Sequence, residues 1–403
     1  MTKIEELIKK NCPNGVEYKR IGDIAIYEQP GKYIVNDTKY SNSYDTPVLT
    51  AGQTFILGYT NESQGIYPAS ENNPVIIFDD FTGAFKWVVF PFKVKSSAMK
   101  MITANTDKTT LRYLYYLMGF LNYTSDAHQR LWISVYSNFK VPLPHLPVQE
   151  EIVRILDKFT ELTKELTKEL TKRKQQYQWY RDSLLTFDNP CSYIKKLLDK
   201  YCPDGVEYKE LSEIFDIRNG YTPSKAKAEY WENGVIPWFR MEDIRTNGNI
   251  LSEAIQHITK EAVKNKPFPP NSIIVSTTAT IGEHALITVP FLSNQQFTCL
   301  ALKDEFKDKY DIKFLFYYCY KLDEFCLNNI NKGNFASVDM SKFKMFTFPL
   351  PPIDVQQRIV SILDRFDSLC NNIVEGLPAE ITARQKQYEF FRDKLLFFNT
   401  QND

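Results

Sequence analysis

The sequence contains an internal repeat, and this feature limits the possible folds more than any other. The segment "CPNGVEYKRIGDI" begins at Cys12, and "CPDGVEYKELSEI" begins at Cys202, with eight of 13 positions identical. "PLPHLPVQEEIVRILDKFTEL" from Pro142 returns as "PLPPIDVQQRIVSILDRFDSL" from Pro349, and "RKQQYQWYRDSLLTF" returns as "RQKQYEFFRDKLLFF". These matches keep their order at offsets of 190, 207 and 211 residues. A period near 200 residues is that of whole duplicated domains, because solenoid repeats are far shorter.

The stretches between the matching ends have diverged. Residues 25–140 and 215–347 share little beyond pattern, and the clearest trace is "NPVIIFDDFTGAFKWVVFPF" against "PNSIIVSTTATIGEHALITVPF", which aligns Gly83 with Gly282. Short β-branched and aromatic runs bounded by Gly, Pro and Asn predict strands in both middles. Ends that stay alike and middles that differ are expected when the ends share one task and each middle has its own.

A helix is predicted near the end of each middle. The runs Thr109–Thr124 and Asp311–Ile330 carry apolar residues at helical spacing. Their many Tyr and Phe side chains fit core packing, which we favour, or a platform on which nucleic-acid bases stack.

A long helix is predicted after each PLP segment, over 149–187 and 355–398. Apolar residues fall on a seven-residue grid, and Glu and Lys flank the stripe in "TELTKELTKELTKRK", which is the pattern of a coiled-coil face. Gly and Pro in "EGLPAE" predict a kink or break near 376–378. Either helix alone fits an ordinary amphipathic helix, but two matched ones favour a mutual antiparallel coiled coil.

The expected fold class is α+β, with two β-rich domains and two long antiparallel coiled-coil helices related by an internal pseudo two-fold axis. The predicted segments are a first domain over 1–148, a first long helix over 149–187, a linker over 188–201, a second domain over 202–354 and a second long helix over 355–398. The repeated CPxGVEYK segments would then be shared fittings for the same neighbouring surface on each half.

Composition narrows the function. The 49 basic and 49 acidic residues cancel, whereas a general polyanion binder normally carries a basic excess. A sequence reader can still keep its positive charge in local loops. No apolar run reaches 18 residues, so no membrane span is expected, and "MTKIEELIKKN" is too charged for a secretory signal. A cytoplasmic protein is therefore expected.

No catalytic centre is visible in the sequence. The four histidines and seven cysteines show no metal-ligand spacing, and no Walker-type, GxGxxG or GxSxG motif occurs. The paired acids of "FDD" (Phe78–Asp80) could serve acid–base chemistry or Mg²⁺. The aligned second copy has Ser276 and Thr277 instead, so turn or surface acids are favoured. No catalytic and no metal-binding residue is therefore assigned.

The repeated motifs resemble the specificity (S) subunits of type I restriction-modification systems. The resemblance is carried by the two "PLP...Q..IV.IL" helix openings, the "Y..(Y/F)RD.LL" helix ends, and the second-copy segments "NGYTPSKAKAEYWENGVIPWFRMEDI" and "TIGEHALITVPFLSNQQF". It covers nearly the whole chain. The first copy lacks clear versions of the TPS and NQQF segments, and Val148 and Val355 stand where many relatives have Glu.

The resemblance implies a non-catalytic subunit that recognises double-stranded DNA. Each domain would be a target recognition domain that reads one half of a split, asymmetric site, and the paired helices would set the gap between the halves. Two methyltransferase subunits with S-adenosylmethionine, and up to two restriction subunits with ATP and Mg²⁺, would dock on a chain that itself holds no cofactor. The alternatives are a non-DNA scaffold on a coiled-coil rod and, less favoured, a fused restriction-type enzyme.

Candidate contacts follow from groove chemistry: Arg and Lys bind guanine edges, Asn and Gln bind adenine edges, and Lys, Ser and Thr contact phosphates. The DNA candidates are Arg240, Arg245, Thr277, Thr278, Thr280, Asn294, Gln295 and Gln296 in the second domain, and Gln53, Thr54, Tyr59, Asn61, Thr82 and Lys86 in the first. The amides of "SNQQF" fit a buried structural network equally well. The candidate partner contacts recur in the repeat: Tyr18, Tyr208, Gln149, Gln356, Tyr177, Tyr388, Arg181 and Arg392.

Overall fold

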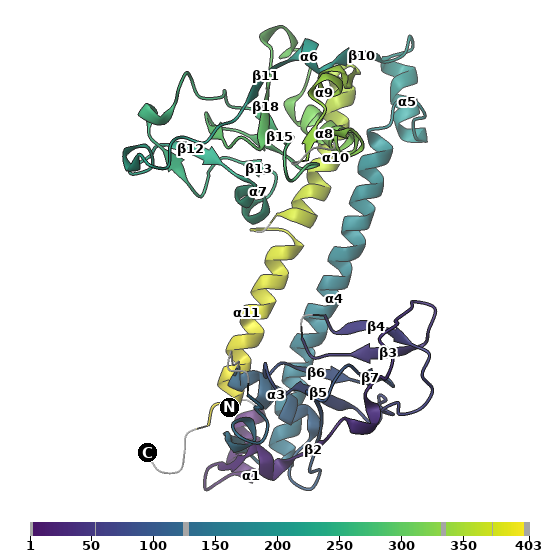
Figure 1. Ribbon diagram of the computed structural model, residues 1–403, viewed down its shortest axis with the longest axis vertical. Helices are drawn as coiled ribbons and strands as arrows, with labels where there is room; N and C mark the ends of the chain where they lie inside the picture. Colours follow the sequence, from purple (N-terminus) through teal and green to yellow (C-terminus); the bar gives the residue numbers. More distant parts are fainter. Residues whose placement is uncertain (1–2, 53, 124–128, 332–335, 373, 399–403) are drawn as a thin grey trace. The chain divides into compact units, whose positions relative to one another are not determined.

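The computed structural model describes the chain except for residues 1–2, 53, 124–128, 332–335, 373 and 399–403 (Figure 1). Its contacts divide the chain into two units. The first unit comprises Met1–Lys164 and Ala383–Asp403, and the second comprises Glu165–Thr382. Each unit thus combines a β-rich part with segments of the long helices. No helix among the described residues is long and apolar enough to cross a membrane.

The first unit contains a four-stranded and a three-stranded sheet. The larger sheet runs β2 (Ala25–Glu28), β8 (Met99–Ala104), β5 (Val75–Asp79) and β6 (Phe85–Val88), all antiparallel. The smaller sheet runs β4 (Ile56–Thr60), β3 (Thr46–Leu49) and β7 (Lys93–Val94), with β3 antiparallel to β4 and parallel to β7.

The central strands of the larger sheet, β8 and β5, are buried on both faces. Side chains alternate along a strand, so Ile76 and Phe78 join the cluster around α3 (Leu111–Leu121), while Ile77 joins the cluster that contains Leu49 of the smaller sheet. The aromatic residues of α3 lie in this core: Tyr113, Tyr116 and their neighbours are almost fully buried. Core packing, favoured over a stacking platform, is the arrangement found.

The second unit repeats this arrangement with further strands. Its larger sheet runs β11 (Phe215–Asn219), β18 (Phe297–Leu302), β15 (Ser272–Ser276), β16 (His284–Ile287) and β13 (Ile250–Leu251). Its smaller sheet runs β14 (His257–Ile258), β12 (Ile236–Phe239) and β17 (Leu292–Ser293), again with one antiparallel and one parallel pair. A short pair, β19 (Ile330–Asn331) and β20 (Ser337–Val338), follows α8 (Ile312–Asn328). Order and direction therefore match between β2-β8-β5-β6 and β11-β18-β15-β16, and between β4-β3-β7 and β14-β12-β17.

The faint sequence match between the middles corresponds to a matching hairpin. Gly83 lies in the turn between β5 and β6 with φ of 77°, and Gly282 lies in the turn between β15 and β16 with φ of 93°. Glycine is the residue that tolerates this left-handed region at no steric cost. The turn closes from Asp79 N to Ala84 O in the first unit and from Ser276 N to Glu283 O in the second, each at 2.8 Å.

The repeated CPxGVEYK segment forms a strand that pairs with the strand before each long helix. In the first unit β1 (Glu17–Arg20) is antiparallel to β9 (Lys140–Leu143), and in the second β10 (Glu207–Glu210) is antiparallel to β21 (Thr347–Leu350). The register is the same, with Tyr18 opposite Pro142 and Tyr208 opposite Pro349. In both units the segment therefore pairs with the strand that leads into a long helix.

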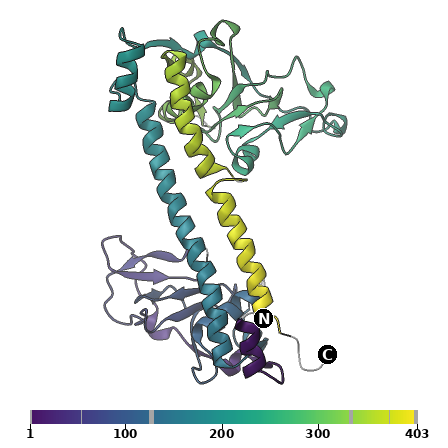
Figure 2. The same ribbon diagram turned by 180° about the vertical axis from the view of Figure 1, so that it is seen from behind.

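The helices around these strands are repeated as well. α1 (Lys3–Asn11) precedes β1, and α5 (Ser192–Tyr201) precedes β10 inside the stretch expected to be a linker. Figure 2 shows α1 beside the start of α4, where Lys3 Nζ lies 3.0 Å from Glu151 Oε2. Single turns α2 (Ile21–Ile24) and α6 (Leu211–Ile214) follow the paired strands, and α7 (Met241–Asn247) and α9 (Met340–Met345) complete the second unit.

The long helices differ in continuity. α4 is unbroken over Leu146–Leu184, so both of its ends lie three residues earlier than expected. The early start is possible because Pro147 fits in the first turn of a helix. The second long helix is interrupted: α10 spans Ile353–Asn371 and α11 spans Leu377–Leu396. The predicted break therefore lies a few residues earlier, and Pro378 stands in the first turn of α11 instead of interrupting a helix.

Within each unit the long helix segments run antiparallel and share stacked rings. In the first unit Phe159 of α4 stacks on Phe391 of α11, with ring centroids 5.3 Å apart. In the second unit Phe366 of α10 stacks on Tyr180 of α4 at 5.0 Å. These are equivalent positions in the repeat. Stacked pairs in this range stabilise beyond the area that they bury.

Candidate nucleic-acid interface

Two predicted reading segments of the second unit leave the same edge of the smaller sheet. β12 and β17 are parallel, with Phe239 opposite Ser293, so their carboxyl ends lie together. Arg240 follows β12 and Asn294 follows β17, and Asn294 N donates to Phe239 O at 3.0 Å. The chain topology thus brings Arg240 next to the Asn294–Gln296 segment, although more than 50 residues separate them in sequence.

The β15–β16 turn, which carries Thr277, Thr278 and Thr280, borders the same segment. Thr277 N donates to Gln296 O at 3.0 Å, and Thr280 N donates to Thr278 O at 2.9 Å inside the turn. The eight predicted DNA contacts of the second domain therefore fall into one neighbourhood, which also includes Arg245 through its ion pair with Glu283 of the turn at 3.1 Å.

The three amides of "SNQQF" were expected either to contact DNA or to form a buried structural network, and they differ in exposure and in hydrogen bonding. Asn294 Nδ2 donates to Gln296 Oε1 at 3.1 Å, and Gln296 N donates to Asn294 Oδ1 at 3.1 Å, so these two partly satisfy each other. Gln295 is exposed and accepts a hydrogen bond from the Thr222 hydroxyl. Gln295 is thus the amide best placed to contact a base edge.

Arg240 and Thr277 differ in how far their side chains are exposed to solvent. The Arg240 guanidinium is half-buried, lies 5.7 Å from the Trp238 ring and 3.0 Å from Glu242, and its Nε finds no acceptor among the described residues. An unpaired buried donor is costly, so a ligand acceptor would stabilise it. Thr277 is 6% exposed and its hydroxyl bonds to Thr298, which leaves it no surface for DNA.

The predicted contacts of the first unit lie on two different sheets. Thr82 is exposed in the β5–β6 turn and Lys86 is exposed on β6. Thr54, Tyr59 and Asn61 belong to the β3–β4 hairpin and the residue after it, with Tyr59 half-buried and the other two exposed. Gln53 lies outside the described residues.

The topology also identifies first-unit residues that sequence reasoning missed. Lys95 N donates to Leu49 O at 3.2 Å, which is the bond that Asn294 makes to Phe239. Thr50 and Lys95 therefore occupy the places of Arg240 and Asn294. Extending the sequence match past "VPF" and "FPF" would have placed "KSSA" opposite "NQQF".

The "FDD" acids serve the structure. Asp79 Oδ1 accepts from Phe81 N at 2.9 Å inside the turn. Asp80 is 2% exposed, accepts from Trp132 N at 2.7 Å and pairs with Lys100 and Arg130. Asp80 thus lies at the start of the turn, one of the two places expected for it, but is buried. Burial lowers the pKa of Lys100, and Asp80 opposes that effect. Among the described residues no three His, Cys, Asp or Glu side chains could hold a metal ion.

The glutamine after each PLP segment is an internal clamp. Gln149 Oε1 accepts from Thr109 Oγ1 at 2.9 Å, and its Nε2 donates to Pro144 O at 2.7 Å and Lys108 O at 3.0 Å. Gln356 does the same in the second unit: Oε1 accepts from Asp311 N at 2.9 Å, and Nε2 donates to Pro351 O and Lys309 O at 2.8 Å.

Both glutamines are fully buried. Their donors and acceptors are engaged with the backbone at the start of α3 or α8. A partner protein cannot touch them in this structure, so we assign both residues an internal role in place of the predicted partner contact.

The other repeated residues also join helix ends to the domains. Tyr18 donates to Phe398 O, and Tyr208 donates to Asp188 Oδ1 at 2.9 Å; both acceptors directly follow a long helix. Burial and the bond to Asp188 raise the pKa of Tyr208. Such bonds tie each repeated strand to the end of a long helix as well as to the start of one.

The arginines and tyrosines near the helix ends pack inward too. The Arg181 guanidinium lies 4.1 Å from the Tyr320 ring centroid on α8, and Arg392 Nη1 donates to Gly119 O on α3 at 3.4 Å. Tyr177 is buried in the second core, and Tyr388 is half-buried with a pKa raised by burial. Partner contact through these residues stays a prediction, and the contacts observed are internal.

A repeated acid in the "ILDKF" and "ILDRF" motifs was not singled out from the sequence. Asp157 Oδ1 accepts from Arg112 Nε at 2.7 Å and from the Tyr116 hydroxyl. Asp364 accepts from Lys313 Nζ and from the Tyr317 hydroxyl, each at 2.7 Å. The repeat itself carried the signal, since acid, cation and tyrosine recur in the same order in both copies.

Comparisons with known proteins agree with this architecture. The family model described as type I restriction modification DNA specificity domain matches residues 13–173 and again 203–383. The chain is 46% identical over 402 residues to the specificity subunit of the type I restriction enzyme EcoR124I/EcoR124II of Escherichia coli, covering 95% of this chain and 94% of that one. It is 54% identical over 215 residues to the Escherichia coli EcoprrI specificity subunit, covering 51% and 53% of the chains.

Solved structures share the fold at low sequence identity. The crystal structure of the S subunit of a type I restriction-modification system from M. genitalium covers 96% of this chain and 97% of its own, with a TM-score of 0.57 and 12% identity. A chain from a study of complex assembly and conformational transition of the type I R-M system covers 95% and 97%, with a TM-score of 0.54 and 17% identity.

A twice-matched DNA specificity domain and a duplicated α+β architecture define a non-catalytic DNA-recognition protein with two target recognition domains. The chain belongs to the family of type I restriction-modification specificity subunits. Such subunits are the DNA-recognition components of their systems, so the fused-enzyme alternative is set aside.

Proposed function

We propose that each unit reads one half of a split, asymmetric DNA site. The observation that carries this proposal is the combination of one topology with two sets of side chains: Arg240 and Asn294 leave the edge of the smaller sheet in the second unit, where Thr50 and Lys95 stand in the first. The same platform with different polar groups is suited to reading two different base sequences.

Groove chemistry supports roles for the second unit. Arg240 can donate two hydrogen bonds to a guanine edge and Gln295 can bond an adenine edge. Arg245, Thr278 and Thr280 suit phosphate contacts that fix the register. Thr277, Asn294 and Gln296 support this surface from beneath or within.

In the first unit Lys86 and Lys95 are exposed and suit guanine edges or phosphates. Asn61 is exposed and suits an adenine edge, while Thr54, Tyr59 and Thr82 suit phosphate contacts. The DNA contacts of the proposal are therefore the predicted set without the buried Thr277, extended by Lys95. Thr50 marks the equivalent edge of the smaller sheet, and its hydroxyl serves a local turn.

The chain also docks two methyltransferase subunits in this proposal, and through them restriction subunits. S-adenosylmethionine would be bound by the methyltransferase, and ATP and Mg²⁺ by the restriction subunit, with no cofactor in this chain. Two comparisons support this view: one relative is named as the specificity subunit of a type I restriction enzyme, and one solved structure comes from a study of complex assembly of the type I R-M system.

An exposed aromatic residue recurs in each unit and marks where docking would occur. Trp179 and Phe390 occupy the same repeat position, and both are 62% exposed. Each ring lies edge-on to a ring of the helix stack: Trp179 on Tyr180 at 4.9 Å, and Phe390 on Phe391 at 5.4 Å. Aromatic anchors of this kind dominate many interfaces, and two matched anchors fit two copies of one partner.

A methylome tests the proposal. The chain is expressed with a type I methyltransferase subunit in a host free of DNA methylation, and modified bases are mapped in the genomic DNA. One two-part asymmetric motif is expected. Unmodified DNA, while the same methyltransferase is active beside its own specificity subunit and co-purifies with this chain, would contradict it.

A further inference from the structure

Beneath the hairpin of each unit, two neighbouring positions hold a pair of polar side chains, and this pair differs between the two units. Phe78 on β5 is opposite Lys100 on β8, and Val275 on β15 is opposite Thr298 on β18. The next bonds correspond as well: Asp80 N donates to Ala98 O at 2.9 Å, and Thr277 N donates to Gln296 O at 3.0 Å. Asp80 and Lys100 therefore take the places of Thr277 and Thr298.

In the first unit this pair is ionic. Lys100 Nζ lies 3.4 Å from Asp80 Oδ2, and both side chains are at most 3% exposed. Arg130 Nη1 approaches the same oxygen at 3.2 Å, while Asp80 Oδ1 accepts from Trp132 N at 2.7 Å. The charges are thus paired and hydrogen-bonded, which is the condition for burying them.

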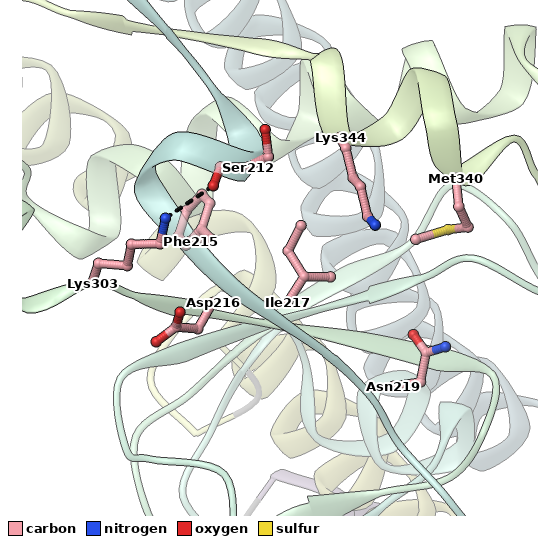
Figure 3. A pocket seen from close by; sticks show the side chains of 8 residues that line it. All are labelled: Ser212, Phe215, Asp216, Ile217, Asn219, Lys303, Met340 and Lys344. Atoms are coloured by element: carbon pink, nitrogen blue, oxygen red, sulfur yellow. Dashed lines mark hydrogen bonds between the residues drawn. The ribbon is translucent and has the colours of Figure 1, made fainter.

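In the second unit the pair is neutral. The Thr277 and Thr298 hydroxyls are 2.8 Å apart, and Thr298 Oγ1 donates to Asn219 Oδ1 at 3.1 Å. Asn219 ends β11 and borders a cavity of about 500 Å³ that Met340 and Lys344 of α9 also line (Figure 3). The bonds therefore run from the hairpin, across β18, to the edge strand β11.

Each pair connects two segments that carry proposed DNA contacts. One member, Asp80 or Thr277, begins the hairpin turn. The other, Lys100 or Thr298, follows the loop that contains Lys95 or Gln295. Main-chain bonds also tie each turn to a third segment, since Leu131 N donates to Asp80 O at 2.7 Å and Val338 N donates to Thr277 O at 2.9 Å.

We propose that Asp80–Lys100 and Thr277–Thr298 are positioning pairs, each of which sets base discrimination in its own half-site without touching DNA. Each pair fixes the spacing between a hairpin turn and a reading loop, so removing it lets the two segments move apart. The proposal rests on the proposed function, because it presumes that each unit reads one half-site.

The first test is Thr298→Val, which keeps the side-chain shape and removes the hydroxyl. Methylation rates are measured on duplexes that carry single-base changes in either half-site. The ratio of methylation rates on correct and mismatched duplexes is expected to fall about three- to tenfold for the half-site that the second unit reads, as for the loss of part of a mismatch penalty. The ratio for the other half-site is expected to stay unchanged. Thr298→Ser restores the hydroxyl and is expected to restore discrimination.

Two further variants keep the test informative if Thr298→Val folds poorly. Asn219→Ala removes the exposed end of the hydrogen-bond chain. It is expected to lower base discrimination in the same half-site, but by less than Thr298→Val. The double change Asp80→Thr with Lys100→Thr places the neutral pair in the first unit. It is expected to alter base discrimination only in the half-site that the first unit reads.

The outcomes separate the two levels of the proposal. A normal two-part motif with unchanged discrimination in folded Thr298→Val and Asn219→Ala would overturn the positioning role alone. Equal loss in both half-sites would also overturn it, because that result reports general destabilisation. A wild-type chain that directs no two-part motif would contradict the proposed function and the positioning role together.

Discussion

Beneath the hairpin of the first unit a lysine and an aspartate form a buried ion pair, whereas two threonines fill the same places in the second. Around these pairs the strand order, the register and the main-chain bonds agree. A glutamine clamp and an acid–tyrosine contact also recur unchanged in kind. The contacts that connect each domain to its long helix are therefore the same in both units. The side chains near the proposed DNA contacts differ between the units.

The largest expected effect tests the shared part. Gln149→Ala and Gln356→Ala each leave several buried backbone groups unpaired, so each is expected to destabilise its own unit by about 3 kcal/mol. Hydrogen exchange followed by mass spectrometry reads β1–β9 and β10–β21 separately. Equal and local loss of protection would support equivalence, and a large effect in one unit only would break the comparison.

The next effect tests the divergent part. Arg240→Ala is expected to cost about 2 kcal/mol of discrimination at one base pair, as for a lost two-bond contact to guanine. Thr50→Ala at the corresponding place should change little, because the Thr50 hydroxyl serves a local turn bond from Gly52 N. Methylation rates on single-base variants of the site measure both, and an unchanged base preference in Arg240→Ala would remove Arg240 from the reading set.

A smaller effect concerns the repeated acid. Arg112 lies against the rings of Trp87, Tyr115 and Tyr116 at 4.7–5.2 Å, so Asp157→Ala would strand a partly buried cation. Lys313 is 40% exposed and can turn to water.

Asp157→Ala is therefore expected to cost about 2 kcal/mol, and Asp364→Ala about 1 kcal/mol. Urea denaturation of both variants checks the order. A larger cost for Asp364→Ala would show that the cation environment does not decide the difference.

The smallest effect is a pH dependence confined to the first unit. Hydrogen bonds from Arg154, against the opposing effect of burial and with help from Lys3, lower the pKa of Glu151 to about 2. The second unit has Arg358 at this place. Since the folded pKa lies below the usual value of about 4.3, this stabilisation is complete above that pH and is lost as the pH falls toward 2.

Glu151→Gln should thus cost the first unit about 1 kcal/mol or less at pH 7 and flatten its loss of stability below pH about 4.3. Arg358→Gln is the matched control and should leave this pH range unchanged. Urea midpoints at several pH values measure both, and an equally steep acid loss in Glu151→Gln would contradict the assignment.

The sequence predicted the common parts better than the reading edge. Repeated motifs identified the long helices, the break near Gly376 and the family, because helix periodicity and turn residues are local signals. The pairing of β1 with β9 joins segments more than 100 residues apart, and the burial of Gln149 depends on contacts with Lys108 and Thr109, about 40 residues away in the sequence. Periodicity cannot report such contacts, so the two buried glutamines, Gln149 and Gln356, were predicted as partner contacts.

The DNA contacts proposed for the second unit stood out in the sequence, whereas one of those proposed for the first unit did not. Arg240 and Gln295 stood in recognisable motifs, whereas Lys95 lies in a loop with no motif of its own, and the parallel pairing of β3 with β7 gives its place directly. Thr277 had a suitable side chain for DNA, but its burial follows from the register of β15 with β18.

The central claim is that each diverged middle alone determines one half-site. The most direct test replaces residues 25–139 with residues 215–346, which exchanges one middle and keeps the β1–β9 and long-helix parts, and then maps the methylome. The account predicts a motif whose two halves carry the same bases, namely the half-site that Arg240→Ala alters in the unmodified chain. An unchanged asymmetric motif in the folded, methyltransferase-bound exchange protein would contradict it.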